Sequence, residues 1–103
     1  SEDMEILGLL RQKNVRKILL YLLINNNCTF SDIERSINLS PSTVSWYLDS
    51  LMKKGVVNKI SYEDKIIYEL VYDKNRIMKV LITYRESFVD SLVDKTIEMW
   101  DLN

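Results

Sequence analysis

Hydrophobic residues recur with helical spacing over residues 41–54, and this segment carries the clearest signals of the chain. Ser40 stands before it as a capping residue, Pro41 takes the first helical position, and Gly55 follows as a left-handed stop. The apolar positions line one side of such a helix, at intervals of four, three and one residues: Val44, Leu48, Leu51 and Met52. The pattern therefore predicts an amphipathic helix with defined ends.

The opposite side of this predicted helix is polar except for one large aromatic side chain. At about 100° per residue, Trp46 points away from the apolar stripe. Its neighbours on that side are small or polar: Ser42, Thr43, Asp49, Ser50 and Lys53. Such a face is suited to contact with another molecule.

A second, shorter amphipathic helix is predicted immediately before the first. Thr29 and Asp32 have the spacing of a capping box, and the apolar stripe that follows consists of Phe30, Ile33 and Ile37. Only residues 38–40 separate the two helices, so the helices must cross steeply. Asn38 is the expected left-handed residue of the turn, and Leu39 is expected to fill the corner. This arrangement is a helix-turn-helix.

After Gly55 the pattern changes from helical to alternating. Two runs rich in β-branched and aromatic residues, 56–62 and 66–71, have the length of strands. A tight turn at Glu63 and Asp64 joins them, so the sequence predicts a β-hairpin.

The segment of residues 30–48, together with Leu51 and residues 54–57, resembles the winged helix-turn-helix of prokaryotic transcriptional regulators of the ArsR and MarR types. Its most specific part is residues 39–45, with Lys-Gly-Val-Val at the correct distance downstream. The resemblance covers roughly residues 13–72. It implies an α+β, mostly helical fold with a two-stranded β wing, and double-stranded DNA as the partner.

The resemblance also implies which residues contact DNA. The helix over residues 41–54 lies in the major groove in such proteins, and the preceding helix crosses the backbone. The positions that contact DNA in the family are occupied here by Ser42, Thr43, Ser45 and Trp46, and Tyr47 takes a position often held by histidine. The cations expected near phosphate groups are Arg16, Lys17, Lys53, Lys54, Lys59 and Lys65. Where related wings commonly carry glycine and arginines at the tip, this sequence has Glu63 and Asp64.

Two helices are predicted before the helix-turn-helix. A short first helix over residues 4–10 has a weak apolar stripe interrupted by Gly8. A stronger helix is expected to begin with Asn14 as its cap and to end at the asparagines of residues 25–27. Residues opposite its main stripe are also apolar: Leu20, Tyr21 and Ile24. Because the helix is apolar nearly all round, a second layer must cover it.

A long amphipathic pattern follows the hairpin and forms a C-terminal helical extension, residues 73–103, beyond a core of residues 1–72. Asp73 is expected to cap it. One unbroken helix to residue 100 would be about 40 Å long, more than a small domain can cover. The helix therefore either breaks near Ser87, where residues 87–90 repeat the capping-box pattern, or projects towards a partner.

Both arrangements favour a homodimer, because the apolar stripe is too long to remain exposed to water. The residues expected at the dimer interface are Leu20, Ile24, Ile77, Leu81, Tyr84, Phe88 and Leu92. The alternative is packing within one chain, across the face that carries Leu20 and Ile24. The resembling regulators are usually dimers, which favours the first interpretation.

Composition narrows the function further. The 103 residues include no histidine and one cysteine, so the usual metal sites and an internal disulfide are not expected. Without histidine or a glycine-rich phosphate loop, neither catalysis nor a bound cofactor is expected. No apolar run is long enough to span a membrane, and the expected location is the cytoplasm.

One alternative function remains open, a winged-helix protein-interaction module with Trp46 as its anchor. Residues 40–72 contain four lysines and four acidic residues, which is atypical of a strong DNA binder. The two hypotheses predict different surfaces. A DNA regulator should show continuous positive charge beside Ser42, contributed by Arg16, Lys17, Lys53 and Lys65. An interaction module should show an apolar patch around Trp46, ringed by acids.

Overall fold

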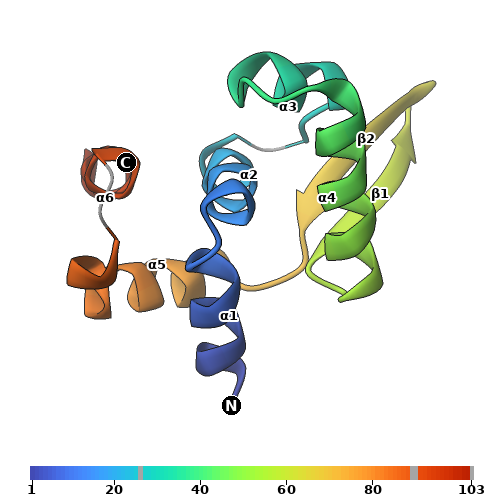
Figure 1. Cartoon of the computed structure of the whole chain (residues 1–103). Helices are drawn as coiled ribbons and strands as arrows, with labels where there is room; N and C mark the ends of the chain where they lie inside the picture. Colours follow the sequence, from blue (N-terminus) through green and yellow to red (C-terminus); the bar gives the residue numbers. More distant parts are fainter. Residues whose placement is uncertain (26, 89–90, 103) are drawn as a thin grey trace.

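The computed structural model describes residues 1–25, 27–88 and 91–102 and shows the expected mixture of helices with one hairpin (Figure 1). In chain order its elements are α1 (Glu2–Leu10), α2 (Lys13–Ile24), α3 (Phe30–Ser36), α4 (Pro41–Lys53), β1 (Val57–Tyr62), β2 (Lys65–Leu70), α5 (Lys74–Thr83), the short 3₁₀ helix η1 (Arg85–Ser87) and α6 (Ser91–Leu102). The α+β, mostly helical fold class is thereby confirmed. Within the described segments, no helix combines the length and apolar character needed to cross a membrane.

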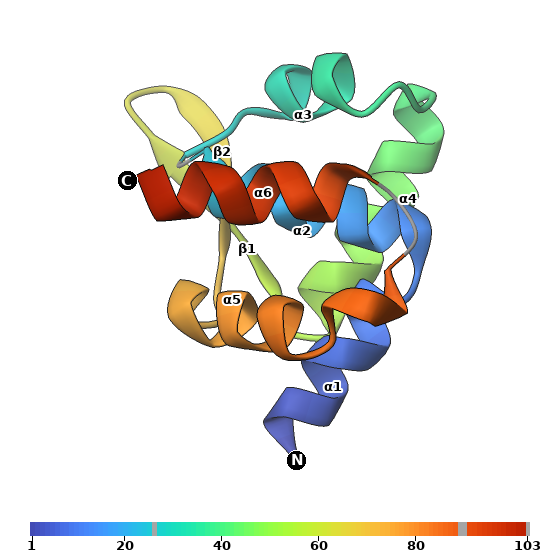
Figure 2. The same ribbon diagram turned by 90° about the vertical axis from the view of Figure 1, so that its left-hand side faces the viewer.

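Helix α2 lies at the centre of the molecule, with α4 and the hairpin on one side and α6 on the other (Figure 1). Figure 2 shows α6 lying over α2. The chain therefore supplies the second layer that the apolar surface of α2 requires. The residues of α2 that are almost completely buried are Ile18, Leu19, Leu20, Leu22 and Leu23. The predicted start was wrong, because α2 begins at Lys13 with Gln12 at the cap position, so Asn14 is inside the helix.

The helix-turn-helix is built by local interactions that the sequence predicted. Thr29 and Asp32 form both hydrogen bonds of a capping box at the start of α3. Asn38 has a φ of 39°, which gives the turn its left-handed residue. Ser40 caps α4 through its hydroxyl, and Gly55 follows that helix with a φ of 73°. Each of these predictions is confirmed.

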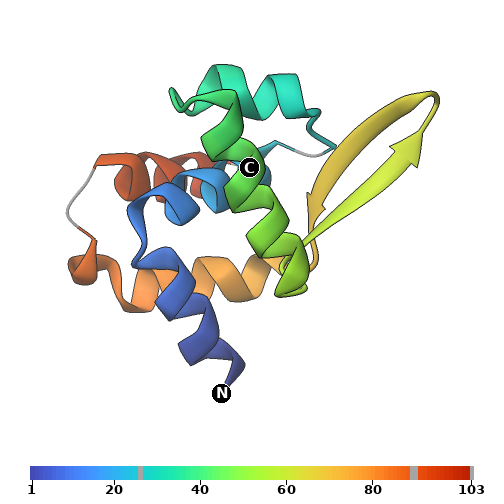
Figure 3. The same ribbon diagram turned by 45° about the vertical axis from the view of Figure 1, so that its right-hand side comes forward.

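Strands β1 and β2 pair antiparallel, from Val57 opposite Leu70 to Tyr62 opposite Lys65. Glu63 and Asp64 both have positive φ, the conformation of a type I′ turn, so the predicted tight turn is confirmed. The hairpin extends away from the helices (Figure 3). Its base is fixed to the chain before α3, because the backbone N–H of Tyr68 donates to the carbonyl oxygen of Cys28 at 2.7 Å.

The C-terminal extension is broken rather than continuous, as one of the two alternatives predicted. Asp73 caps α5 by accepting from the backbone N–H of Asn75 at 2.9 Å, and the helix ends at Thr83. The 3₁₀ helix η1 follows, and α6 begins at Ser91. The capping box predicted over residues 87–90 includes positions outside the described residues. After the break, α6 returns over α2 and also contacts α5.

This return accounts for much of the surface that the sequence assigned to a dimer interface. Leu20, Ile77, Leu81 and Phe88 are buried in the hydrophobic core of a single chain. The structure thus corrects their predicted role, because side chains covered by their own fold cannot present a surface to a second subunit. Ile24, Tyr84 and Leu92 are half-buried, and their place in an interface stays a prediction.

Candidate nucleic-acid interface

Helix α4 has one completely covered side and one open side. Val44, Leu48 and Leu51 are at most 1% exposed and fix the helix against the core. On the other side Ser42 and Ser45 are exposed, and Trp46 keeps 66% of its surface accessible. The core therefore holds α4 without using the polar face, which remains available to a partner.

The first turn of α4 gathers three hydroxyl groups at the positive end of the helix dipole. The Oγ atom of Ser40 accepts from the backbone N–H of Thr43 at 3.3 Å and lies 2.7 Å from Thr43 Oγ1. Ser42 Oγ is 3.3 Å from Ser40 Oγ. No acidic side chain occupies this turn. Hydroxyls and a helix N-terminus without carboxylates provide donors for an anion or for base edges.

Trp46 is oriented by an aromatic neighbour. The rings of Trp46 and Tyr47 meet edge to face, with centroids 5.0 Å apart and planes at 86°. Tyr47 is itself half-buried, and its hydroxyl accepts a hydrogen bond from Asn14 Nδ2 at 3.3 Å. Since the phenol oxygen accepts from Asn14, its own O–H remains able to donate to a phosphate.

The exposed charges around α4 and the hairpin are of both signs, with one more lysine than acids. Lys53, Lys54, Lys59 and Lys65 are exposed, and so are Asp49, Glu63 and Asp64. Within the described segments, none of these lysines forms an ion pair with these acids. Positive charge is therefore local to the C-terminal end of α4 and to the strands, whereas the tip of the hairpin is acidic.

Arg16 does not join this surface, contrary to the prediction. Its side chain is only 8% exposed, and Nη1 donates to the carbonyl oxygen of Leu10 at 2.8 Å. The guanidinium group also lies over the Phe88 ring, 5.5 Å from its centroid. Arg16 thus ties α1, α2 and the end of η1 together. A phosphate contact needs an exposed guanidinium, so the assignment of Arg16 to DNA is corrected.

Lys17 is also separated from the outer face of α4. It is half-buried and lines a pocket with residues of α3 and α6. The continuous positive surface expected from Arg16 and Lys17 to Lys65 is consequently not formed.

The capping box of α3 adds a carboxylate that is held ionised. The pKa of Asp32 lies below its ordinary value because the backbone and side chain of Thr29 donate to it, and Arg35 contributes an ion pair at 2.7 Å. The lowered pKa keeps the box intact at neutral pH. Cys28, in contrast, is a buried thiol whose pKa is raised by burial, and it belongs to the core. In the described part of the chain, no group of three or more histidine, cysteine or acidic residues could hold a metal ion.

Residues 12–59 match the family model described as "Bacterial regulatory protein, arsR family". The matched segment is just under half of the chain and runs from α2 through the helix-turn-helix into β1. This match and the fold together support a winged helix-turn-helix transcriptional regulator that is similar to the ArsR type. The coarse function of the protein is accordingly that of a DNA-binding transcriptional regulator.

A solved structure shows the same fold over most of the chain. The crystal structure of the transcriptional repressor BigR from Xylella fastidiosa aligns with a TM-score of 0.66 and 19% sequence identity. The alignment covers 86% of this chain and 89% of the BigR chain. Among curated proteins, no significant match to the sequence was found.

The sequence analysis missed one residue of the ArsR-type site. Asn14 was interpreted as a helix cap, but its amide supports Tyr47 across 33 positions of the chain. Asparagine is common both at caps and in side-chain hydrogen bonds, so its type alone could not separate the two roles. No signal within α2 or α4 alone could have paired these two residues, because they are distant in the sequence.

Proposed function

We propose that this ArsR-type regulator binds double-stranded DNA as a homodimer, with α4 in the major groove and the hairpin beside the backbone. The observation that carries the proposal is the exposed outer face of α4, led by Ser42 and centred on Trp46, opposite a stripe that is completely buried. The preceding helix α3 then crosses the backbone, and the left-handed residue Asn38 lies in the turn between the two helices.

Base recognition on this face depends on hydroxyls and one indole. Ser42, Thr43 and Ser45 donate to or accept from base edges or phosphates. Trp46 cannot make the bidentate contact by which arginine recognises guanine. Its exposed ring instead packs on thymine methyl groups or on sugar, which favours sites with thymine at that position.

Phosphate contacts come from both ends of the surface. Lys53 and Lys54 lie at the end of α4, Lys59 and Lys65 lie on the hairpin, and the Tyr47 hydroxyl adds an uncharged donor. The four lysine contacts together give a salt slope of about −3.6 for each bound subunit. The acidic tip of the hairpin disfavours insertion into the minor groove and favours contacts alongside the backbone.

A second copy doubles this surface. Helices α1 and α5 pack together and carry the exposed apolar side chains Met4 and Ile82. We place the dimer contact on these elements because their exposed apolar side chains lie outside the outer face of α4. Dimers of helix-turn-helix proteins reach half-sites one helical turn apart, about 34 Å. Met4→Glu and Ile82→Glu should lower the particle mass to that of one chain. Ile66→Glu, which changes an equally exposed residue on β2, should leave the mass unchanged.

Selection of duplexes from a random pool at moderate salt tests DNA binding directly. We expect an enriched sequence that binds the wild type, and Ser42→Asp should weaken its binding at least tenfold by placing negative charge in the groove. Asn75→Asp is the matched control, because it adds the same charge at the second residue of α5, another helix without acids in its first turn. Failure of the pool to enrich, or equal affinity of the two variants, would reject the proposal.

One observation favours a second candidate function. The balance of exposed lysines and acids around α4, with Asp49 one turn from Trp46, also fits a protein partner anchored by the indole. In that case the random pool yields no enriched duplex, and any binding through Trp46 is insensitive to salt.

A further inference from the structure

A pocket of about 460 Å³ lies between α2, the end of α3 and α6. This volume is within the range of small-molecule sites in proteins. The pocket stands on the side of α2 that faces α6, whereas α4 and the hairpin lie on the other side (Figures 1 and 2). Its walls are predominantly apolar and include Leu20, Tyr21, Ile24, Ile37, Leu92 and Met99. The pocket is therefore distinct from the proposed DNA surface.

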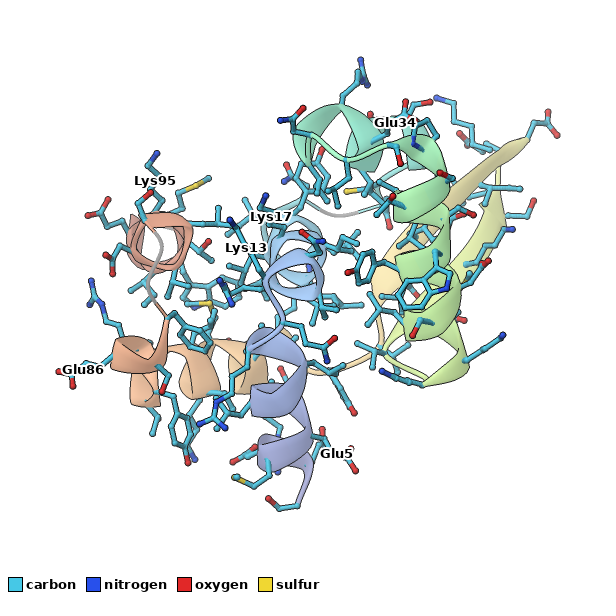
Figure 4. The ribbon with its side chains drawn as sticks, in the orientation of Figure 1. Glu5, Lys13, Lys17, Glu34, Glu86 and Lys95 are labelled. Atoms are coloured by element: carbon cyan, nitrogen blue, oxygen red, sulfur yellow. The ribbon has the colours of Figure 1, made fainter. Side chains whose placement is uncertain are left out.

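All of the charge on the lining side chains is positive. Lys17 from α2 and Lys95 from α6 line the pocket, and no carboxylate does. Within the described segments, neither ammonium group has an ion-pair partner. Figure 4 shows both lysines on the part of α2 and α6 nearer α3, whereas Glu5 and Glu86 lie towards the opposite end and Glu34 lies near α4.

Two neutral polar groups of the pocket already form hydrogen bonds within the fold. The Thr96 hydroxyl donates to the carbonyl oxygen of Leu92 at 2.8 Å, and Asn25 Nδ2 donates to that of Tyr21 at 3.0 Å. Lys17 is half-buried and Lys95 is exposed, so their ammonium groups meet solvent while their stems border the apolar wall. The pocket thus offers an apolar interior and positive charge at its edge.

We propose that this pocket binds a small amphipathic organic anion, with its carboxylate near Lys17 and Lys95 and its apolar tail against Ile24 and Leu92. Two ammonium groups beside one pocket disfavour a cation and favour an anion. A purely polar anion would leave the apolar wall in water, whereas an alkyl tail removes that wall from solvent. The two lysines and the apolar lining together therefore favour a ligand with an anionic group and an apolar tail.

Titration calorimetry on the full chain at low ionic strength tests the site with three probes of equal tail length. Octanoate should bind, 1-octanol should bind about tenfold more weakly because it lacks the charge, and octylammonium should not bind. Absence of octanoate binding, or equal binding of octanoate and octylammonium, would overturn the proposal.

Matched variants locate the binding. Lys17→Gln and Lys95→Gln should each weaken octanoate about fivefold, the loss expected for one partly exposed ion pair, and Lys79→Gln on α5 should have no effect. Ile24→Ser should also weaken octanoate, whereas Ile66→Ser, at an exposed isoleucine of β2 outside the pocket, should not. Wild-type affinity in both lysine variants contradicts the assignment. The assignment is also contradicted if octanoate does not bind and Ile24→Ser converts a dimer to single chains. In that case a second copy of the chain would occupy the pocket.

The pocket also borders the turn of the helix-turn-helix, through Ser36, Ile37 and Asn38. This step rests on the proposed function. A bound anion that contacts the turn changes the placement of α4, and it therefore changes the affinity for the selected duplex. Octanoate should shift that affinity in the wild type and not in a Lys17→Gln, Lys95→Gln double variant. If no duplex is bound at all, the proposed function fails, and the calorimetric titration still decides the pocket.

Discussion

Helices α2 and α4 have almost the same length, yet the fold uses them in opposite ways. Helix α2 is apolar nearly all round and is covered by its own chain, to the extent that even Arg16 is drawn inside. Helix α4 buries one stripe and leaves Trp46 in solvent. The comparison shows that the capacity to contact a partner resides where the fold leaves a helix face unused, rather than where hydrophobic or charged residues are most frequent.

The comparison predicts its largest effect in the core. Leu19→Ala on α2 should lower the free energy of unfolding by about 2–5 kcal/mol, because it leaves a cavity at a residue that is 1% exposed. Ser45→Ala on the exposed face of α4 should change it by less than about 0.5 kcal/mol. Urea unfolding of both variants measures the difference, and similar losses would show that the two helices are not used differently.

Arg16 gives the next largest effect. Arg16→Met should cost about 1–3 kcal/mol, because the carbonyl oxygen of Leu10 loses a buried charged donor. The same variant should leave the salt slope of duplex binding unchanged. If Arg16→Met lowers the magnitude of the salt slope and leaves the free energy of unfolding unchanged, Arg16 contacts DNA after all.

These two helices also show how far the sequence could predict the fold. The start of α4 and the capping box of α3 follow from residues within four positions of one another, and both were correct, whereas α4 ends at Lys53, one residue before its predicted end. The burial of Arg16 depends on Leu10 and Phe88, which come from other elements. Helical spacing shows that a charge lies on a given side of a helix, but it does not show which element will cover that side.

The candidate site divides in the same way. The exposed serines and Trp46 were found because they oppose an apolar stripe within one helix. The support that Asn14 gives Tyr47 and the pocket between α2, α3 and α6 require contacts between distant segments. No local pattern in the sequence could indicate them.

A smaller effect is expected from the exposed lysines. Lys53→Gln should weaken binding to every duplex sequence and reduce the magnitude of the salt slope by about 0.9, since one phosphate contact is lost. Lys17→Gln, at a lysine on the covered helix, should leave the slope unchanged in the absence of octanoate. Affinity measurements from 50 to 200 mM salt (roughly the range in which such slopes are resolved) compare the two. Equal slopes for wild type and Lys53→Gln would exclude the contact.

The smallest effect concerns acid. Because the folded-state pKa of Asp32 is lowered, its ionised form contributes stability above its ordinary pKa of 3.8, and this contribution is lost as the pH falls through the folded value. The Asp3 carboxylate beside Arg76 behaves likewise. Asp32→Asn should therefore be less stable than wild type at pH 7 and approach it at pH 3. A difference that stays constant across this range in urea unfolding would contradict the cause assigned to the lowered pKa.

The affinity of Trp46→Ala for the selected duplex, measured together with its melting temperature, tests the central claim most directly. The account predicts that affinity falls about tenfold or alters its sequence preference, while the melting temperature stays within about 2 °C of wild type, as expected for an exposed side chain. A large fall in melting temperature, or unchanged affinity and sequence preference, would contradict the claim that the open face of α4 reads DNA.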